Sequence, residues 1–276
     1  MKKLLAVACV LGTTFTAFSF DKETVVPQGT VKSYTKTNYT ISSKFGTFYR
    51  TPETKYVHTY NIAGLESERT ELTGTDVLTD RLSFQYDMSN TLLSTTLFNA
   101  DGVQIEQTTY TYDAAGKVNT VEVVSKDGVL LSKTVYKTAD GKEDKSEYDG
   151  EGALEKKTIT VFADDGKATE IFVYSGDGNL SQKQSFSYDV SRNLAEITYY
   201  GADGKRTKRD SYLYKPGETH ATEIQVFDNA DTLLERKNLS YDEKGNTTKI
   251  STYTVSEKFG ETVTELSDIV EYSFQY

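Results

Sequence analysis

The chain has 276 residues, with 31 basic and 41 acidic side chains, two His, one Cys and no Trp. Its hydrophobic fraction of 37% includes 20 Tyr, so purely apolar side chains are scarce for a globular domain and we expect a thin or layered core. The net charge of −10 disfavours nucleic acid and anionic membranes as partners, and the abundance of Tyr, Phe and Val argues against disorder.

The first 19 residues have the pattern of a secretory signal peptide. A basic start at Lys2 is followed by an apolar core over residues 4–11 and by a small-residue cleavage site ending at Ser19. Cleavage removes Cys9, so disulfides, thiolate zinc ligands and cysteine nucleophiles are not expected. The mature chain then has 29 basic and 41 acidic residues, a net charge of −12. We predict an exported protein in the periplasm, at the cell surface or secreted.

Residues 20–80 are rich in Thr, Tyr and Phe but show no regular spacing. Irregular strands are expected here, because Thr and aromatic residues favour extended backbone. Repeat arrays need atypical ends, so this segment is predicted to be a β-rich cap on the first repeat. A linker between the signal and the array is the alternative interpretation.

Residues 81–256 contain a repeat that is marked by aromatic side chains. An aromatic residue precedes a turn every 12 to 14 residues, with Val124 in one of these positions. The aromatic positions are Tyr86, Phe98, Tyr112, Tyr136, Tyr148, Phe162, Tyr174, Tyr188, Tyr200, Tyr214, Phe227 and Tyr241. The segments between them are rich in Thr, Val, Ile and Tyr and leave about eight to ten residues for a strand. One strand and one turn therefore form the repeating unit.

Two kinds of turn connect the predicted strands. One is Tyr-Asp-x-x-Gly, as in Tyr112–Gly116, and the other is centred on Asp-Gly, as in Asp101-Gly102. Gly supplies the positive φ of tight hairpins, and Asp accepts hydrogen bonds from its own turn. Short turns make neighbouring strands antiparallel. The predicted fold is all-β, an elongated antiparallel meander of strand–turn units. The sequence does not decide whether the sheet is flat, spiral or partly closed.

Three segments share an aromatic-x-Tyr-Asp motif, and a fourth, weaker match has Leu239 in the aromatic position. The motif extends to Gly in Tyr110–Gly116 and Leu239–Gly245, and only its first half is present in Phe84–Asp87 and Phe186–Asp189. On these residues the chain resembles the YD-repeat (RHS-type) family, and its Asp-Gly turns are similar to those of bacterial β-hairpin repeat proteins. The resemblance implies an extracellular β-array used for binding or encapsulation.

Residues 257–276 end in strict alternation of polar and apolar side chains from Val270 to Tyr276. This pattern is typical of a last amphipathic strand that closes the array, and also of the terminal strand of an outer-membrane barrel. A membrane barrel needs an outward apolar band about 25 Å tall, whereas Lys and Glu fall on both faces of the predicted strands. An outer-membrane barrel or barrel-associated protein is therefore the alternative prediction.

The sequence contains few residues suited to catalysis. His58 and His220 are 162 residues apart, and no Gly-x-Ser-x-Gly motif accompanies them. Most Asp residues fall in predicted turns, where backbone hydrogen bonding explains them. We predict no enzyme activity, no metal site and no cofactor. Because carboxylate pairs are frequent, a carbohydrate-active enzyme is the second alternative.

The row of Tyr residues is the remaining candidate for function. Exposed rings can stack on sugars or anchor a protein, although the same rings would also pack the repeat. The candidate residues are Tyr112, Tyr136, Tyr148, Tyr174, Tyr188 and Tyr200. The predicted function is a non-enzymatic scaffold of the bacterial cell envelope that binds an envelope protein or glycan, with no nucleic acid. Membrane association is left open.

Overall fold

The computed structural model describes residues 25–45 and 47–276, so the predicted signal peptide lies outside the described residues. Within them, all regular structure is β-strand, and no helix suited to crossing a membrane occurs. The strands are β1 (Ser33–Lys44), β2 (Thr47–Tyr60), β3 (Glu66–Thr73), β4 (Leu78–Tyr86), β5 (Leu92–Asn99), β6 (Gln104–Tyr112), β7 (Val118–Ser125), β8 (Leu130–Ala139), β9 (Lys142–Asp149), β10 (Leu154–Phe162), β11 (Ala168–Ser175), β12 (Leu180–Tyr188), β13 (Leu194–Gly201), β14 (Arg206–Tyr214), β15 (Ala221–Asp228), β16 (Leu233–Tyr241), β17 (Thr247–Lys258) and β18 (Glu261–Gln275).

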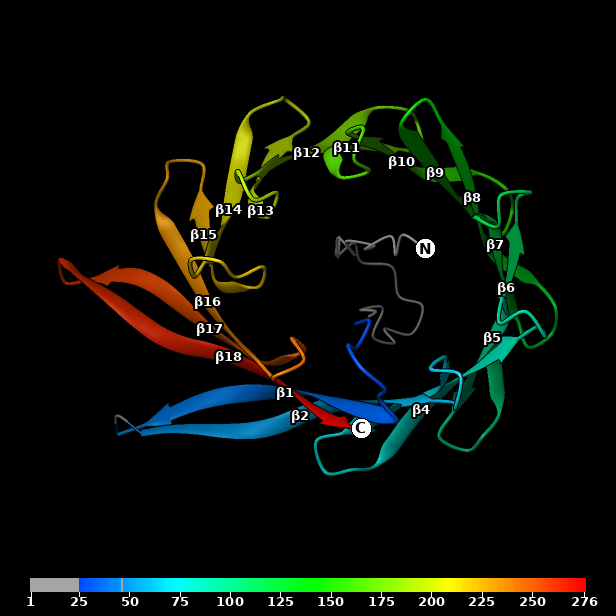
Figure 1. The fold of residues 1–276 in the computed structure, drawn as a ribbon, viewed down its shortest axis with the longest axis horizontal. Coiled ribbons are helices and arrows are strands. Elements are labelled where there is room, and N and C mark those ends of the chain that lie inside the picture. Colours follow the sequence, from blue (N-terminus) through cyan, green and yellow to red (C-terminus); the bar gives the residue numbers. More distant parts are fainter. Residues whose placement is uncertain (1–24, 46) are drawn as a thin grey trace.

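Each strand pairs antiparallel with the strands before and after it, and β1 also pairs with β18. This last register runs from Ser33 opposite Gln275 to Thr40 opposite Asp268 and closes the sheet into a ring (Figure 1). The predicted all-β meander is confirmed. Its sheet, whose form the sequence did not decide, is a closed 18-stranded barrel. Closure pairs the two sheet edges that an open meander would leave without hydrogen-bond partners.

The turns form as their residues predict. Asp113 Oδ1 accepts hydrogen bonds from the backbone N–H groups of Ala115 and Lys117, at 2.8 and 2.9 Å. Gly116 then takes a φ of 75°, which side chains other than Gly, Asn and Asp rarely adopt. The acid of a Tyr-Asp turn therefore holds the backbone in its bend.

Tyr residues at the ends of even-numbered strands explain much of the aromatic spacing. In five of them the hydroxyl donates a hydrogen bond to the carbonyl of a residue 20 positions earlier, at the start of the preceding strand. These bonds, of 2.6 to 2.8 Å, are Tyr86 to Glu66, Tyr112 to Leu92, Tyr188 to Ala168, Tyr214 to Leu194 and Tyr241 to Ala221. Each bond joins the two strands of one pair at the same rim of the barrel. The repeat is thus a two-strand unit closed by a Tyr hydroxyl.

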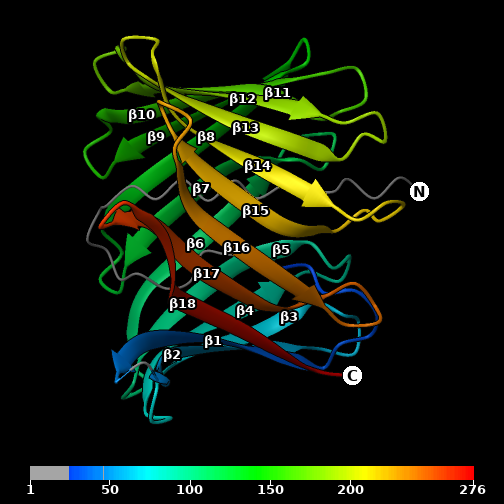
Figure 2. The ribbon, with the colours of Figure 1, turned by 90° about the vertical axis from the view of Figure 1, so that its left-hand side faces the viewer.

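The two rims of the barrel differ. One carries the β2–β3 turn and Tyr276, and we call it the C-terminal rim; the other carries the β1–β2 and β17–β18 turns, and we call it the hairpin rim (Figure 2). Residues 33–80 contribute β1 to β3 and the start of β4 to the same wall as the repeat. The proposed division into a cap over 20–80, an array over 81–256 and a final strand over 257–276 stays a prediction.

Candidate functional site: the barrel lumen

Alternate side chains of every strand face the lumen or the outside. Residues 25–32 lie inside the outline of the ring in Figure 1, and Val25 and Val31 line the same cavity as Arg69, Phe84 and Tyr110. These positions therefore face the lumen. The same side of the sheet carries the most deeply buried large side chains, which are Tyr34, His58 and Gln184.

The start of the described chain is fixed across the C-terminal rim. Gln28 and Asn246 exchange two hydrogen bonds, in which the Gln28 N–H donates to the Asn246 side chain at 2.5 Å and the Asn246 amide donates to the Gln28 carbonyl at 3.1 Å. Asn246 is buried, and Lys32 N–H donates to Gln275 at 2.7 Å. The segment therefore forms one wall of a cavity at the mouth of the lumen.

This cavity has a volume of about 700 Å³ and is lined mostly by apolar side chains. Its lining includes Val25, Val31, Leu65, Leu82 and Phe84. Further round the barrel, a second apolar cluster of the lumen consists of Ile171, Val173, Phe186 and Ile197. A volume of this size is in the range of small-molecule sites.

One charged cluster, which we call the lumen triad, borders the cavity: His58 on β2, and Glu66 and Arg69 on β3. His58 Nδ1 donates to Glu66 Oε1 at 2.7 Å, and Arg69 donates from Nε and Nη2 to the two carboxylate oxygens, both at 2.9 Å. The His58 ring stacks on Tyr34 with centroids 4.1 Å apart. All three charged or polar groups are thereby held in one rigid arrangement.

The electrostatics of the triad leave a fixed carboxylate. Burial alone would raise the pKa of Glu66, but the hydrogen bonds from His58 and Arg69 outweigh it and hold the pKa below its ordinary value. Glu66 therefore stays ionised and neutralises Arg69 at neutral pH. Burial and the nearby Glu66 raise the pKa of Tyr86 to about 12, so its hydroxyl stays neutral and donates to the Glu66 carbonyl.

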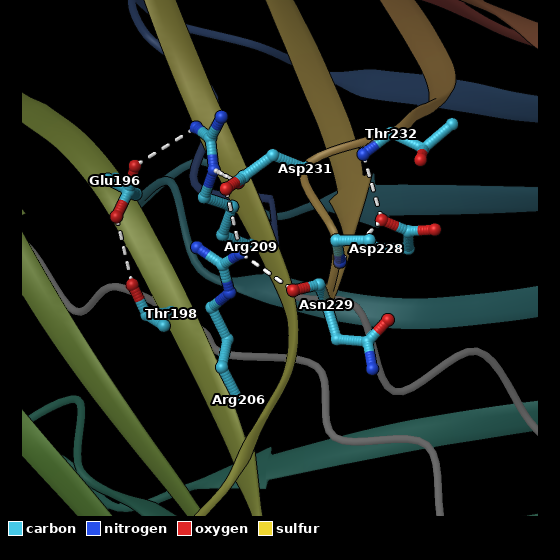
Figure 3. Close-up of polar contacts among 9 residues, drawn as sticks. Glu196, Thr198, Arg206, Arg209, Asp228, Asn229, Asp231 and Thr232 are labelled. Carbon is cyan, nitrogen blue, oxygen red and sulfur yellow. Dashed lines mark hydrogen bonds and ion pairs between the residues drawn. The ribbon is translucent and has the colours of Figure 1, made fainter.

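The outer face carries a band of ion pairs, which we call the outer girdle. A basic residue on an even-numbered strand meets an acid on the strand before it. The pairs are Arg81–Glu68, Lys133–Glu122, Lys157–Asp144, Lys183–Glu170 and Arg209–Glu196, with N–O distances from 2.6 to 3.3 Å. Figure 3 shows Arg209 bound to Glu196 on β13 and to Asp231 in the β15–β16 turn.

Aromatic rings complete the girdle. The ring of Phe227 lies 3.9 Å from the Arg209 guanidinium, and Phe98 lies 4.6 Å from that of Arg81. Each ring is directly opposite its cation in the strand register. Cross-strand pairs of this kind stabilise a sheet.

The six Tyr residues predicted as partner-binding do not form one site. Tyr112 and Tyr188 use their hydroxyls to join the two strands of their own units, and Tyr136 faces the lumen, where burial raises its pKa. The other three lie on the outer face opposite Lys133, Lys157 and Lys183, and they are Tyr148, Tyr174 and Tyr200. All six are partly buried. Whether any of them binds a partner stays a prediction.

Sequence analysis missed the lumen triad, because nothing local pairs His58 with Glu66. His58 lies on β2, and only 1% of it is exposed. His220 is exposed in the β14–β15 turn, against the ring of Tyr241. A usable signal was the cluster of opposite charges between Glu66 and Arg69 beside a predicted turn.

Comparisons with known proteins give no family assignment. No family model matches the chain, and no curated protein matches it. Among solved structures, a porin-like protein from Bacteroides uniformis is 12% identical with a TM-score of 0.33, covering 90% of this chain and 98% of that one. One from Bacteroides vulgatus is 9% identical with a TM-score of 0.34, covering 89% and 98%. A TcdB2-TccC3 structure is 14% identical with a TM-score of 0.19, covering 77% and 16%. TM-scores this low assign neither family nor function.

Proposed function

We propose that the protein is a closed β-barrel of the bacterial cell envelope that stands in water and holds a neutral, mainly apolar molecule in its lumen. Of the functions predicted from the sequence, this is closest to the barrel-associated alternative. An open scaffold is less suitable, because pairing of β1 with β18 removes its free sheet edges and encloses a lumen. The proposed role is binding without catalysis.

The outer girdle is the observation that carries the location. Placing an Arg or Lys on the lipid face of a barrel costs about 2–4 kcal/mol at the bilayer midplane. Arg81, Lys183 and Arg209 each lie near the middle of a strand on the outer face. A lipid-embedded wall would have to bury these residues and their acids, whereas a wall in water leaves them solvated.

The chemistry of the ligand follows from the cavity. Its lining is apolar and aromatic, and its one cation, Arg69, is already neutralised by the two oxygens of Glu66. An anionic ligand would have to compete with that carboxylate. A neutral molecule instead needs only to displace water from Leu82, Phe84 and Tyr110.

A barrel that spans the outer membrane is the second candidate. Its support is closure of 18 strands by a C-terminal strand that alternates through Val270, Tyr272 and Phe274. These three side chains, however, lie on the lumen side: Phe274 pairs with Tyr34, and their rings are 5.4 Å apart. In a membrane barrel the apolar set would point outward.

Detergent phase partition separates the two candidates. We expect the mature chain, residues 20–276, to fold without detergent and to remain in the aqueous phase of a Triton X-114 separation. A variant with Leu in place of both members of each of the five girdle pairs should move toward the detergent phase, because the girdle then becomes apolar. Recovery of the unaltered chain in the detergent phase would favour the membrane-spanning barrel.

Binding in the lumen is tested with the neutral fluorescent probe N-phenyl-1-naphthylamine. Leu82→Gln should weaken binding of the probe about tenfold, because the probe loses the apolar contact area that the Leu82 side chain offers in the lumen. Ile159→Gln is the matched control, since Ile159 is also partly buried but lies on the outer face opposite Phe172. Equal loss in both variants, or no binding by the unaltered barrel, would refute the lumen site.

A further inference from the structure

Two hairpins continue beyond the barrel wall at the hairpin rim. Pairing of β1 with β18 ends at Thr40, while β1 and β2 pair on to Lys44 and Thr47. Pairing of β16 with β17 ends at Thr254, while β17 and β18 pair on to Lys258 and Glu261. Both projections point away from the ring on the same side of the molecule (Figure 1). We call them the two rim hairpins.

The rim hairpins have the same unusual tip. Each turn has the sequence Lys-Phe-Gly, at residues 44–46 and 258–260, whereas most other turns of the barrel contain Asp. Phe45 and Phe259 are fully exposed and have φ values of 52° and 55°. A positive φ is unfavourable for a bulky residue, and Asn, Asp or Gly would form the same turn more easily. Two tips therefore expose a ring at a position where folding alone favours a small polar residue.

We propose that the two rim hairpins dock the barrel onto a lipid bilayer, with Phe45 and Phe259 inserted at the level of the headgroups and upper acyl chains. Phe48 and Tyr49, both about half exposed, add aromatic surface to the first hairpin. Aromatic rings are favoured at the membrane–water interface. The inference needs the barrel wall to stand in water, but it does not depend on the lumen ligand.

A bilayer suits these tips better than a protein surface does. Ser42, Ser43 and Thr47 lie near the first ring in the sequence, and Ser256, Glu257 and Glu261 near the second, all of them exposed. A protein interface needs a continuous apolar core, which a few rings on polar stems do not provide. Fluid acyl chains can close around a single ring, and the polar stem then lies among the headgroups. Because the chain is acidic overall, insertion is expected without a requirement for anionic lipid.

The absence of Trp from the sequence allows each position to be tested with a single reporter. Phe45→Trp and Phe259→Trp in the mature chain should shift their emission to shorter wavelength on addition of phosphatidylcholine–phosphatidylethanolamine vesicles. Phosphatidylcholine brominated on its acyl chains should quench both. Phe45→Ser with Phe259→Ser should lower the vesicle partition coefficient at least tenfold, because two buried rings are lost.

Two control reporters make the outcome decisive. Val190→Trp is equally exposed, but it lies in the β12–β13 turn at the C-terminal rim, and Ile159→Trp lies on the outer wall. Quenching at the tips alone supports docking. No shift at the tips overturns it, as does an emission shift that depends on protein concentration without vesicles, which would indicate self-association. Quenching at Ile159→Trp would overturn both docking and the proposed barrel in water.

Discussion

Replacing Glu66 by Ala is expected to lower the free energy of unfolding by about 3–5 kcal/mol, because it leaves a buried Arg69 without its carboxylate. Only 5% of Arg69 is exposed, and Glu66 accepts two of its hydrogen bonds and one from His58. Urea denaturation of the mature chain at pH 7, followed by circular dichroism, measures the loss.

The outer girdle provides the matched control. Glu122→Ala removes a carboxylate 2.9 Å from Lys133, but both side chains are about 40% exposed. Exposed pairs contribute about 0–1 kcal/mol, so this variant should remain close to the unaltered chain. Glu66→Leu combined with Arg69→Leu should recover much of the stability, since no buried charge then remains unpaired. Similar losses for Glu66→Ala and Glu122→Ala would contradict the buried triad.

The same contact predicts a pH dependence. The pKa of Glu66 is lower in the folded chain than its ordinary value of 4.5, so the carboxylate stabilises the fold fully above that pH. Its contribution is lost as the pH falls through the folded pKa. The stability difference between the unaltered chain and Glu66→Leu should therefore shrink below pH 4.5 and stay constant from there to neutrality.

Local patterns were sufficient to predict the strands and turns. Tyr86, Tyr112, Tyr188, Tyr214 and Tyr241 each end a two-strand unit and form the same bond to its start, so the residues recur once per unit and periodicity reveals them. Asp113 and its equivalents bond only their own turns, and such local chemistry can be read without knowing the rest of the chain.

Closure and the lumen could not be predicted in the same way. Ser33 and Gln275 pair across 242 residues, and nothing near either residue encodes the other. The strand register also decides which face is inside, and both faces of these strands mix charged and apolar residues. Lys183 and Gln184 stand in one run of polar residues, and nothing in that run shows which is buried. Lys183 lies in the outer girdle, while Gln184 is almost fully buried in the lumen. The candidate site depends on which side chains face the lumen, so the sequence alone could predict the fold class but not the site.

The second large loss of stability is expected where two backbone segments lie close together at the hairpin rim. Gly176 follows β11 at a point where an added Cβ would lie 1.9 Å from the carbonyl oxygen of Leu154 on β10. Gly74 meets the carbonyl of Pro52 at the same distance. A backbone oxygen cannot move aside as a flexible side chain does. We therefore expect Gly176→Ala to lower the free energy of unfolding by about 3 kcal/mol.

Gly178, two residues further along the same turn, separates this steric effect from backbone conformation. It has a φ of 84° and nothing within 4 Å of an added Cβ, so Gly178→Ala should cost only about 1 kcal/mol. Asn tolerates positive φ, so Gly178→Asn should restore most of that loss, whereas Gly176→Asn should be at least as damaging as Gly176→Ala. Thermal and urea unfolding of the four variants measure the contrast. If Asn were tolerated at Gly176 and not at Gly178, the contact between β10 and the β11–β12 turn could not explain why position 176 requires Gly.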